Sequence, residues 1–510
     1  MTHTTRTTNT THTATTAHTP HTTRTPRARA TRQLLRAACT LAAAALAVTT
    51  ATAVVAAAPA QAAPAHGRTE RVSIGLGAAQ PDGASFAAGV SADGRLAVFT
   101  SGATNLVPGD TNGKNDVFVR NLWTGATERV NLGADGTQAA GDSFDAAISG
   151  NGRYVTFSSY ATNLAPGANL GFEDVYVHDR WTGRTELVST GHDPAAPAQT
   201  GKLSGHPSIS WDGRYIAYQS NRSDLAPGTV TWLGGNIYVA DRWTGRTRLV
   251  SIGADGAEAN ASSADPVISA DGGSVGFISK ATNIVGQDKP GALAPAAAAQ
   301  LAAGASDEEF VRDSFRHDAH PEILKPRFYP LYVRDLRAEE TRLASPDGAG
   351  GYRGAATPAL SPDGRFAVFS SPVPDGGSPW SHHFEVYVRD LEEDTETLVS
   401  VGLPGTKTAG DSSNARMTAD NRWVYFSSTA ENLVPGDTNN ARDVFRRDLW
   451  TGRTERVSLA ADGSQSAGNS DDPFVDALGT TVVFSSEDGG LVAGDTNRAS
   501  DVFLRRLPLF

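Results

Sequence analysis

Cysteine is almost absent from this sequence of 510 residues: Cys39 is the only one. It lies in an N-terminal stretch that contains no acidic residue, carries five arginines between Arg24 and Arg36, and then runs into LAAAALAVTTATAVVAAAPAQA. That order is typical of a secretory signal peptide, and it predicts that residues 1–62 are removed after Ala60-Gln61-Ala62. The remaining chain has no cysteine, which excludes disulfides as a source of stability outside the cell. It must rely on a large core.

An uncleaved transmembrane anchor is the alternative interpretation of the same apolar run. The run is diluted by threonine and ends in small residues rather than basic ones, which favours cleavage. We therefore expect an exported monomer, secreted or held in the cell envelope, with no membrane insertion after cleavage.

Basic residues are also in the minority. Without the leader and its six arginines, 38 Lys and Arg stand against 55 Asp and Glu, a formal net charge of −17. Such a surface repels phosphate groups, so the charge balance argues against nucleic acid as a partner.

What the sequence does contain is repetition. The stretch Ala103–Leu132 recurs at Ala430–Leu459 with 22 of 30 positions identical. Self-similarity of this kind indicates a repeat architecture. Seven units share a short turn between two apolar runs, which predicts a tight hairpin because Gly and Asn tolerate positive φ. The turns are Asp93-Gly94, Asn151-Gly152, Asp212-Gly213, Asp271-Gly272, Asp363-Gly364, Asp420-Asn421 and the degenerate Leu478-Gly479.

Each unit continues with a loop, a third apolar run, a Thr-Gly turn and a fourth run. Four short antiparallel strands per repeat predict an all-β fold, a seven-bladed β-propeller over residues 63–510, with a stacked solenoid as the alternative. The seventh unit stops after its third run, whereas an orphan fourth run occupies Gly67–Gly77. We expect this N-terminal strand to complete the last blade and close the ring, which removes two open sheet edges.

The fourth unit is oversized because of an insertion at about 286–328. Pro295 can begin a helix that stops at Gly304, and Ser306-Asp307-Glu308-Glu309 forms a capping box for a second one. We therefore expect two short helices over one face of the fourth blade.

The expected strand order places the short Asp-Gly and Thr-Gly turns on one face of the ring. The long loops, the insertion and the crossings between blades, such as AGDSFD, AGDSSN and AGNSDD, then share the opposite face. We expect any ligand site on this long-loop face, because binding residues concentrate on loops held by a rigid scaffold.

Three of the long loops carry the pattern Asp-x-Asn-x-x-x-Asp. Oxygen ligands at this spacing suit a hard cation, and calcium is abundant outside cells, so a weak structural calcium site is one interpretation. The other is that these residues only form side-chain-to-backbone turns. The candidate ligands are Asp110, Asn112 and Asp116, then Asp437, Asn439 and Asp443, and finally Asp495, Asn497 and Asp501.

Other candidate groups have a structural explanation that we prefer. Ser274 lies in a G-x-S-x-G pattern, but it follows a hairpin turn rather than a strand-to-helix turn, and no catalytic triad can be assembled. His317 and His320 form a charged patch with no third metal ligand identified. Four tryptophans precede Thr-Gly turns, and we expect their indoles to pack between blades rather than to form an aromatic rim for carbohydrate or protein. They are Trp123, Trp181, Trp243 and Trp450.

The pattern S-x-D-G-R-x-hydrophobic-x-F-x-S followed by D-V-F/Y-V-R-D resembles the WD-repeat-like propeller repeat of the C-terminal domain of TolB and of many exported bacterial proteins. The resemblance covers about Gly67 to Phe510 and implies the fold, not a function. TolB itself has a separate α/β domain before a six-bladed ring, and this chain matches neither feature. Its lipoprotein partner is therefore not implied.

Two functions from different classes remain open. The leading hypothesis is an exported, non-catalytic propeller that binds a protein or a cell-envelope polymer, such as an envelope polysaccharide, through its long-loop face. The alternative is a propeller enzyme, a glycosidase or lyase acting on polysaccharide, which would need paired carboxylates or a His, Tyr and Arg set at the mouth of the ring.

Overall fold

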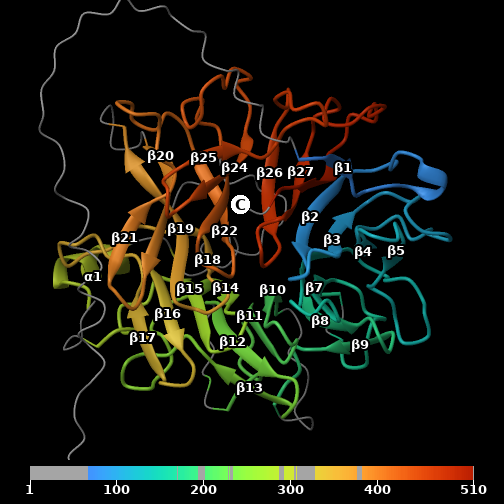
Figure 1. Ribbon diagram of the computed structural model, residues 1–510. Coiled ribbons are helices and arrows are strands. Elements are labelled where there is room, and N and C mark those ends of the chain that lie inside the picture. Colours follow the sequence, from blue (N-terminus) through green and yellow to red (C-terminus); the bar gives the residue numbers. More distant parts are fainter. Residues whose placement is uncertain are drawn as a thin grey trace, which may run out of the picture. The chain divides into compact units, whose positions relative to one another are not determined.

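The computed structural model describes residues 67–168, 171–192, 202–227, 229, 234–286, 292–303, 306, 328–375 and 382–508. The predicted signal peptide at 1–62 lies outside these residues. The described strands form seven four-stranded antiparallel sheets, the blades of a propeller (Figure 1). The predicted seven-bladed, all-β architecture is confirmed.

The blades follow the chain in order. Blade 1 contains β2 (Ser85–Val90), β3 (Leu96–Ser101), β4 (Asp116–Asn121) and β5 (Thr127–Arg129). Blade 2 contains β6 (Ser143–Ile148), β7 (Tyr154–Ser159), β8 (Asp174–Asp179) and β9 (Arg184–Leu187). Blade 3 contains β10 (Ser204–Ile209), β11 (Tyr215–Ser220), β12 (Asn236–Asp241) and β13 (Arg246–Leu249). Blade 4 contains β14 (Ser263–Ile268), β15 (Ser274–Ser279), β16 (Leu331–Asp335) and β17 (Glu340–Leu343).

Blade 5 has two longer central strands, whereas the strands of blades 6 and 7 match those of blade 1 in length. Blade 5 contains β18 (Ala356–Leu360), the longer β19 (Phe366–Pro374) and β20 (His382–Asp390), and β21 (Thr395–Leu398). Blade 6 contains β22 (Ser412–Met417), β23 (Trp423–Ser428), β24 (Asp443–Asp448) and β25 (Thr454–Arg456). Blade 7 contains β26 (Ser470–Val475), β27 (Thr481–Ser486) and β28 (Asp501–Arg506), and its fourth strand is β1 (Thr69–Arg71). A 3-10 turn, η1 (Leu76–Ala78), lies between β1 and β2.

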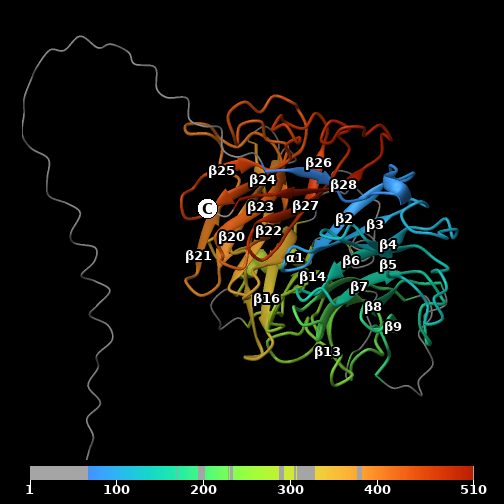
Figure 2. The ribbon, with the colours of Figure 1, turned by 45° about the vertical axis from the view of Figure 1, so that its right-hand side comes forward.

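The ring closes where the two ends of the described chain meet. Strand β1 pairs antiparallel with β28, with Thr69 opposite Arg505. The Ser73 hydroxyl donates to a carboxylate oxygen of Asp501 at 2.6 Å. Figures 1 and 2 show this blue N-terminal strand among the red C-terminal strands. The predicted closure is confirmed: β1 covers the edge of β28 and becomes the outer strand of blade 7.

The first hairpin of each blade forms at the predicted turn. In blade 1 the Ser91 hydroxyl donates to Asp93 at 2.6 Å, and the same carboxylate oxygen accepts the Arg95 N–H at 3.1 Å. Gly94 has φ +67°, a conformation in which a Cβ would be strained. Asn421 takes the same conformation in blade 6, with φ +57°.

A pair of stacked or tilted aromatic rings forms the centre of every blade. One ring comes from the second strand and its direct neighbour from the third, with centroids between 5.6 and 6.1 Å apart. Cross-strand aromatic pairs of this kind stabilise sheets by burial and by ring contact. The pairs are Phe99–Phe118, Phe157–Tyr176, Tyr218–Tyr238, Phe277–Tyr332, Phe369–Tyr387, Phe426–Phe445 and Phe484–Phe503.

The insertion in blade 4 contributes one described helix, α1 (Pro295–Ala302), which begins at the predicted proline. Leu301 of this helix is buried in the same cluster as Leu343, and the Ala294 N–H donates to the Gly350 carbonyl at 2.7 Å. Figure 1 shows α1 at the outer edge of the ring. The predicted second helix from Ser306 lies outside the described residues. Within the described part of the chain, no helix has the length and apolarity needed to cross a membrane.

Candidate functional site

The three predicted Asp-x-Asn-x-x-x-Asp loops share one arrangement around an arginine. In blade 1, Nη1 of Arg129 lies 3.0 Å from Asp110 and 2.9 Å from Asp116. The Asn112 amide nitrogen donates to both oxygens of Asp116 at 3.1 Å. The structure thus brings the three predicted residues together, with a guanidinium between the two carboxylates.

Blades 6 and 7 repeat this arrangement. Arg456 lies 2.8 Å from Asp437 and 3.5 Å from Asp443, which also accepts from Asn439 at 2.9 Å. Arg71 of the closing strand lies 2.9 Å from Asp495 and 3.6 Å from Asp501, which accepts from Asn497 at 3.1 Å.

Burial raises the pKa of Asp443 and Asp501, and hydrogen bonds and the arginine charges oppose that rise. Each of these two buried carboxylates therefore has a positively charged partner within the protein, Arg456 for Asp443 and Arg71 for Asp501.

The arginine was not among the predicted site residues, although the sequence contains a signal for it. The three units with the complete loop pattern are the three whose fourth strand reads Thr-Glu-Arg, at 69–71, 127–129 and 454–456. The other four units carry leucine at the arginine position: Leu187, Leu249, Leu343 and Leu398. The loop pattern and the arginine therefore occur in the same three units, which indicates that the arginine is the partner of the loop carboxylates.

The calcium interpretation stays a prediction. Within the described ranges, no group of three or more His, Cys, Asp or Glu side chains is arranged to hold a metal ion. In each of the three loops the asparagine nitrogen, not its oxygen, faces the carboxylate. In each loop a guanidinium supplies the positive charge that calcium would supply. Substitution of the arginine and chelation of calcium therefore test the two interpretations separately.

A second set of polar residues lies on the first, innermost strand of the blades, around the axis of the ring. The first strand of every blade carries a register irregularity, and in blades 2 to 7 the residue there is not glycine yet has φ between +45° and +54°. Asp, Asn and His tolerate this conformation better than most residues. We call these six residues the channel ring: Asp145, His206, Asp265, Thr357, Asn414 and Asp472.

Neighbouring members of the channel ring contact each other across blades. Nδ1 of His206 lies 3.3 Å from a carboxylate oxygen of Asp145. The Thr357 hydroxyl accepts the Asn414 N–H at 3.3 Å, and the Asn414 amide donates to Asp472 at 2.7 Å and to Asp471 at 3.1 Å. These contacts link successive inner strands around the axis.

Asp472 has the most unusual environment in the channel ring. Burial, followed by the charge of Asp471, raises its pKa to about 7, and the positive charge of Arg416 opposes the rise. A carboxyl group with such a pKa changes its protonation near neutral pH, a property shared by many catalytic acids.

Three channel-ring residues belong to the segments AGDSFD, AGDSSN and AGNSDD, which the expected strand order places among the crossings of the long-loop face. The structure instead places the last residue of each segment, Asp145, Asn414 and Asp472, in the inner strands. The sequence signal for the channel ring is a polar residue two positions after a serine, repeated in five units.

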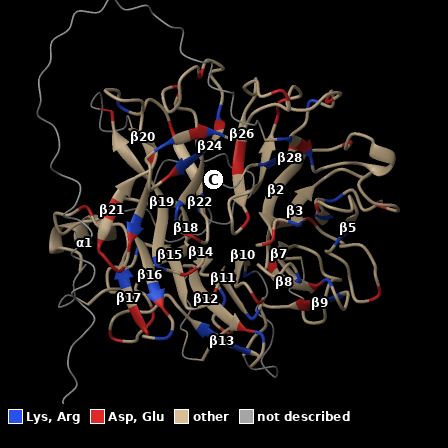
Figure 3. Ribbon diagram, viewed as in Figure 1, with Lys and Arg blue, Asp and Glu red and all other residues tan. Residues whose placement is uncertain are grey.

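A cavity of about 1060 Å³ lies at the outer strands of blades 4 and 5. Its walls include β17 residues 340–343, turn and strand residues of blade 5, and loop residues 253–254, 284–286 and 346–348 from the long-loop side. Four arginines and six carboxylates line it. Figure 3 shows basic and acidic segments interspersed around β16, β17 and β21, where this cavity lies.

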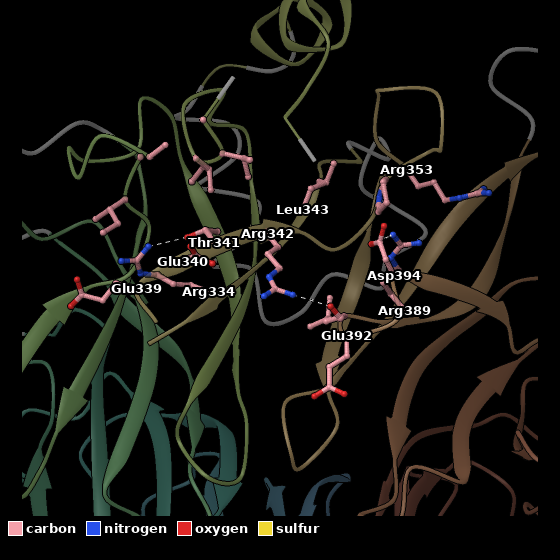
Figure 4. Close-up of a pocket in the computed structure, with 18 of the residues that line it drawn as sticks. Arg334, Glu339, Glu340, Thr341, Arg342, Leu343, Arg353, Arg389, Glu392 and Asp394 are labelled. Atoms are coloured by element: carbon pink, nitrogen blue, oxygen red, sulfur yellow. Dashed lines mark hydrogen bonds and ion pairs between the residues drawn. The ribbon is translucent and has the colours of Figure 1, made fainter. Parts of the chain in front are cut away.

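Ion pairs and hydrogen bonds hold the cavity walls (Figure 4). Arg353 lies 3.2 Å from Glu396 and stacks over the Tyr387 ring at 5.0 Å. Arg342 of blade 4 donates to the Leu391 carbonyl of blade 5 at 2.9 Å. Burial raises the pKa of Glu396, although the charges of Arg353 and Arg389 oppose this. The walls thus present fixed donors and acceptors of both signs.

The tryptophan expectation was wrong. The four indoles do not pack between blades, because Trp123, Trp181, Trp243 and Trp450 are 68 to 74% exposed on the short-turn face. The expectation for Ser274 holds, since it opens strand β15 directly after the hairpin turn. The candidate metal pair His317 and His320 lies outside the described residues.

Comparisons with known proteins add likenesses of fold. No protein-family model and no curated protein sequence matches the chain. Among solved structures, the chain is similar to an oligogalacturonate lyase from Vibrio parahaemolyticus, with 12% identity, a TM-score of 0.47, and coverage of 87% of this chain and 97% of the other. It is also similar to the β-propeller domain of the Trilobed protease from Pyrococcus furiosus (11%, 0.46, 83% and 93%) and to TolB from Acinetobacter baumannii (14%, 0.34, 78% and 76%). The strand pairing of the seven sheets establishes the fold independently of these likenesses.

Proposed function

We propose that the protein is an exported, non-catalytic β-propeller that binds a protein or a cell-envelope polymer at the cavity between the outer strands of blades 4 and 5. The observation that carries the proposal is the cavity itself, about 1060 Å³ in volume and lined by four arginines and six carboxylates. It lies in the one unit that an insertion of about 40 residues makes oversized.

The chemistry of the walls supports a polar, extended ligand. Arg334 donates to the Thr341 hydroxyl at 3.0 Å, and Arg342 spans the two blades, so the donors are held before a ligand arrives. Preorganised polar groups reduce the entropic cost of binding. Arginine donors and carboxylate acceptors together can bind the hydroxyl groups of a sugar chain or the backbone and side chains of a peptide.

Filling the cavity tests the proposal. Ala254 lines it and is exposed, so Ala254→Trp places an indole in the binding space without touching the core. We expect envelope material captured by the immobilised wild-type protein to be lost, or reduced at least tenfold, with this variant. Mass spectrometry and monosaccharide analysis of the eluate would identify it.

The repeat provides a matched control. Ala461 occupies the equivalent position in the Ala-Asp-Gly turn after blade 6, away from the cavity, and is also exposed. Ala461→Trp should capture the same material as the wild-type protein. Equal capture by wild-type, Ala254→Trp and Ala461→Trp proteins would contradict the assignment of binding to the cavity.

The channel ring favours the second candidate function, an enzyme acting on polysaccharide. Asp471 and Asp472 are paired carboxylates that accept from one Asn414 amide, and the pKa of Asp472 is about 7. A carboxyl group that is still partly protonated near neutral pH suits general acid catalysis at a glycosidic oxygen.

A turnover assay on envelope polysaccharides, with release of reducing ends as the signal, separates the two functions. If the wild-type protein releases reducing ends and the Asp472→Asn variant does not, the enzymatic function replaces the binding proposal. Capture without release, unaffected by Asp472→Asn, would support the binding proposal.

A further inference from the structure

The four exposed tryptophans on the short-turn face belong to rigid units. In blade 2, Arg153 donates to both oxygens of Asp179, at 2.8 and 2.6 Å, and its guanidinium lies 4.5 Å from the centre of the Trp181 ring. Asp179 also accepts the Trp181 N–H at 3.1 Å. One carboxylate therefore fixes both the arginine and the backbone that carries the indole.

The same unit recurs in three further blades. Arg214, Asp241 and Trp243 form it in blade 3, with the guanidinium 4.6 Å from the ring centre. Arg422, Asp448 and Trp450 form it in blade 6, at 5.0 Å. In blade 1, Arg95 lies 4.3 Å from Trp123; Asn121 accepts the Trp123 backbone N–H, and Arg95 is paired with Asp93 at 3.5 Å instead. In each unit a cation covers one face of an indole while the residue stays about 70% exposed.

The charge of the exposed turns differs around this face. In three of these units an exposed arginine follows the Trp-Thr-Gly sequence: Arg184, Arg246 and Arg453. Blade 5 has the same bidentate pair, Arg365 with Asp390, but its turn continues with Glu392, Glu393 and Asp394. The tryptophan units therefore place exposed guanidinium groups beside a flat aromatic surface, with Arg184 and Arg453 also 3.5 and 2.8 Å from Glu186 and Glu455. Blade 5 has acidic residues at the equivalent place.

We propose that the Arg-Trp units of blades 1, 2, 3 and 6 bind an acidic polysaccharide of the uronic-acid type, at a surface independent of the cavity between blades 4 and 5. The open indole face stacks on the apolar face of a sugar ring, and the neighbouring arginines pair with its carboxylate. Trp and Arg are also the residues most enriched at energetically dominant contacts.

A polymer explains why the unit is repeated. Equivalent turns of a propeller present the same side chains at regular intervals, which a chain of repeating sugars can engage at several points. Linked weak contacts of this kind raise the overall affinity without a deep pocket. The exposed guanidinium groups of these turns give an anionic ligand points of contact on a protein whose overall charge is negative.

Titration of the purified protein with polygalacturonate tests the proposal, with dextran as a neutral polymer and polyphosphate as a polyanion without sugar rings. We expect polygalacturonate alone to bind well. Replacing all four tryptophans with alanine should weaken binding by about tenfold or more, and Trp181→Ala alone by a few-fold.

The controls separate this surface from the proposed cavity. Ala254→Trp should leave polygalacturonate binding unchanged, and the exposed positions of the indoles should leave the circular dichroism spectrum of the quadruple variant unchanged. Undiminished binding by the quadruple variant would overturn the proposal, as would polyphosphate binding as tight as that of polygalacturonate. Absence of polygalacturonate binding by the wild-type protein would overturn it as well.

Discussion

Blades 5 and 6 are neighbours in the ring and share the same frame. Both have the stacked aromatic pair in their centre and an arginine–aspartate ion pair at the short-turn face, Arg365–Asp390 and Arg422–Asp448. The two blades differ in the residues and loops that are added to this shared frame. Blade 6 has the buried Asp437–Arg456–Asp443 group and the exposed Trp450, whereas blade 5 has longer central strands, a cavity on its outer side and Glu392 in place of tryptophan.

The comparison separates two kinds of residue. Positions that both blades keep, such as the aromatic pair and the turn aspartate, stabilise the blade itself. Positions that differ change the surface or the interior charge without changing the strand order, so they are where binding properties can vary. Three substitutions test this division.

The largest effect is expected from Arg456→Met in blade 6. The arginine side chain is 7% exposed and lies between Asp437 and Asp443, so its loss leaves two buried carboxylates without a positive partner. Removal of one partner from a buried ion pair costs about 3–5 kcal/mol. Urea unfolding followed by circular dichroism would measure the lost free energy of unfolding.

The control lies in the same strand region. Arg453 is 61% exposed, so Arg453→Gln should change the free energy of unfolding by less than about 1 kcal/mol. Chelator and added calcium distinguish the guanidinium from a bound ion. A wild-type melting temperature that falls in excess chelator and recovers with calcium would support the calcium prediction and contradict a stabilising role for the arginine alone.

An intermediate effect is expected in the channel, where blade 5 contributes the neutral Thr357 and blade 7 the acidic Asp472. The raised pKa means that folded Asp472 holds a proton which the unfolded chain releases between about pH 4 and pH 7. Its contribution to stability therefore falls as the pH rises through that window. Asp472→Asn should abolish this pH-dependent loss of stability. The free energy of unfolding should then rise by about 2 kcal/mol at pH 8 and change little at pH 4.

Unfolding curves at pH 4, 6 and 8 would check this prediction. Thr357→Ser is a suitable control, because it keeps an uncharged hydroxyl in the same channel position of blade 5 and should leave the pH dependence of the wild-type protein unchanged. Parallel pH dependence of the wild-type and Asp472→Asn proteins would contradict the proposed protonation.

The smallest effect on stability is expected from Trp450→Ala. The indole is 71% exposed and its contact with Arg422 is worth about 0.5–1 kcal/mol at such a site. Trp423 in the same blade is 9% exposed, and Trp423→Ala should cost about 3–5 kcal/mol because it opens a cavity. Similar melting temperatures for these two variants would show that the exposed tryptophans are structural after all.

The sequence by itself determined the repeat, the seven hairpins and the closing strand. These are local features: a Gly or Asn in a turn with positive φ and a run of apolar residues act over a few positions, and repetition makes them visible. The helix beginning at Pro295 was predictable for the same reason.

Only the tertiary structure decided which side chains meet. Arg456 is separated in the chain from Asp437, and Asn414 lies one blade from Asp472, so their contacts depend on strand pairing and blade packing. The exposure of Trp181 depends likewise on its stacking with Arg153 from another part of the blade, since a sequence gives the size of an indole but not whether it packs between blades. Binding sites in a repeat protein arise from such contacts between units, whereas the fold arises within each unit.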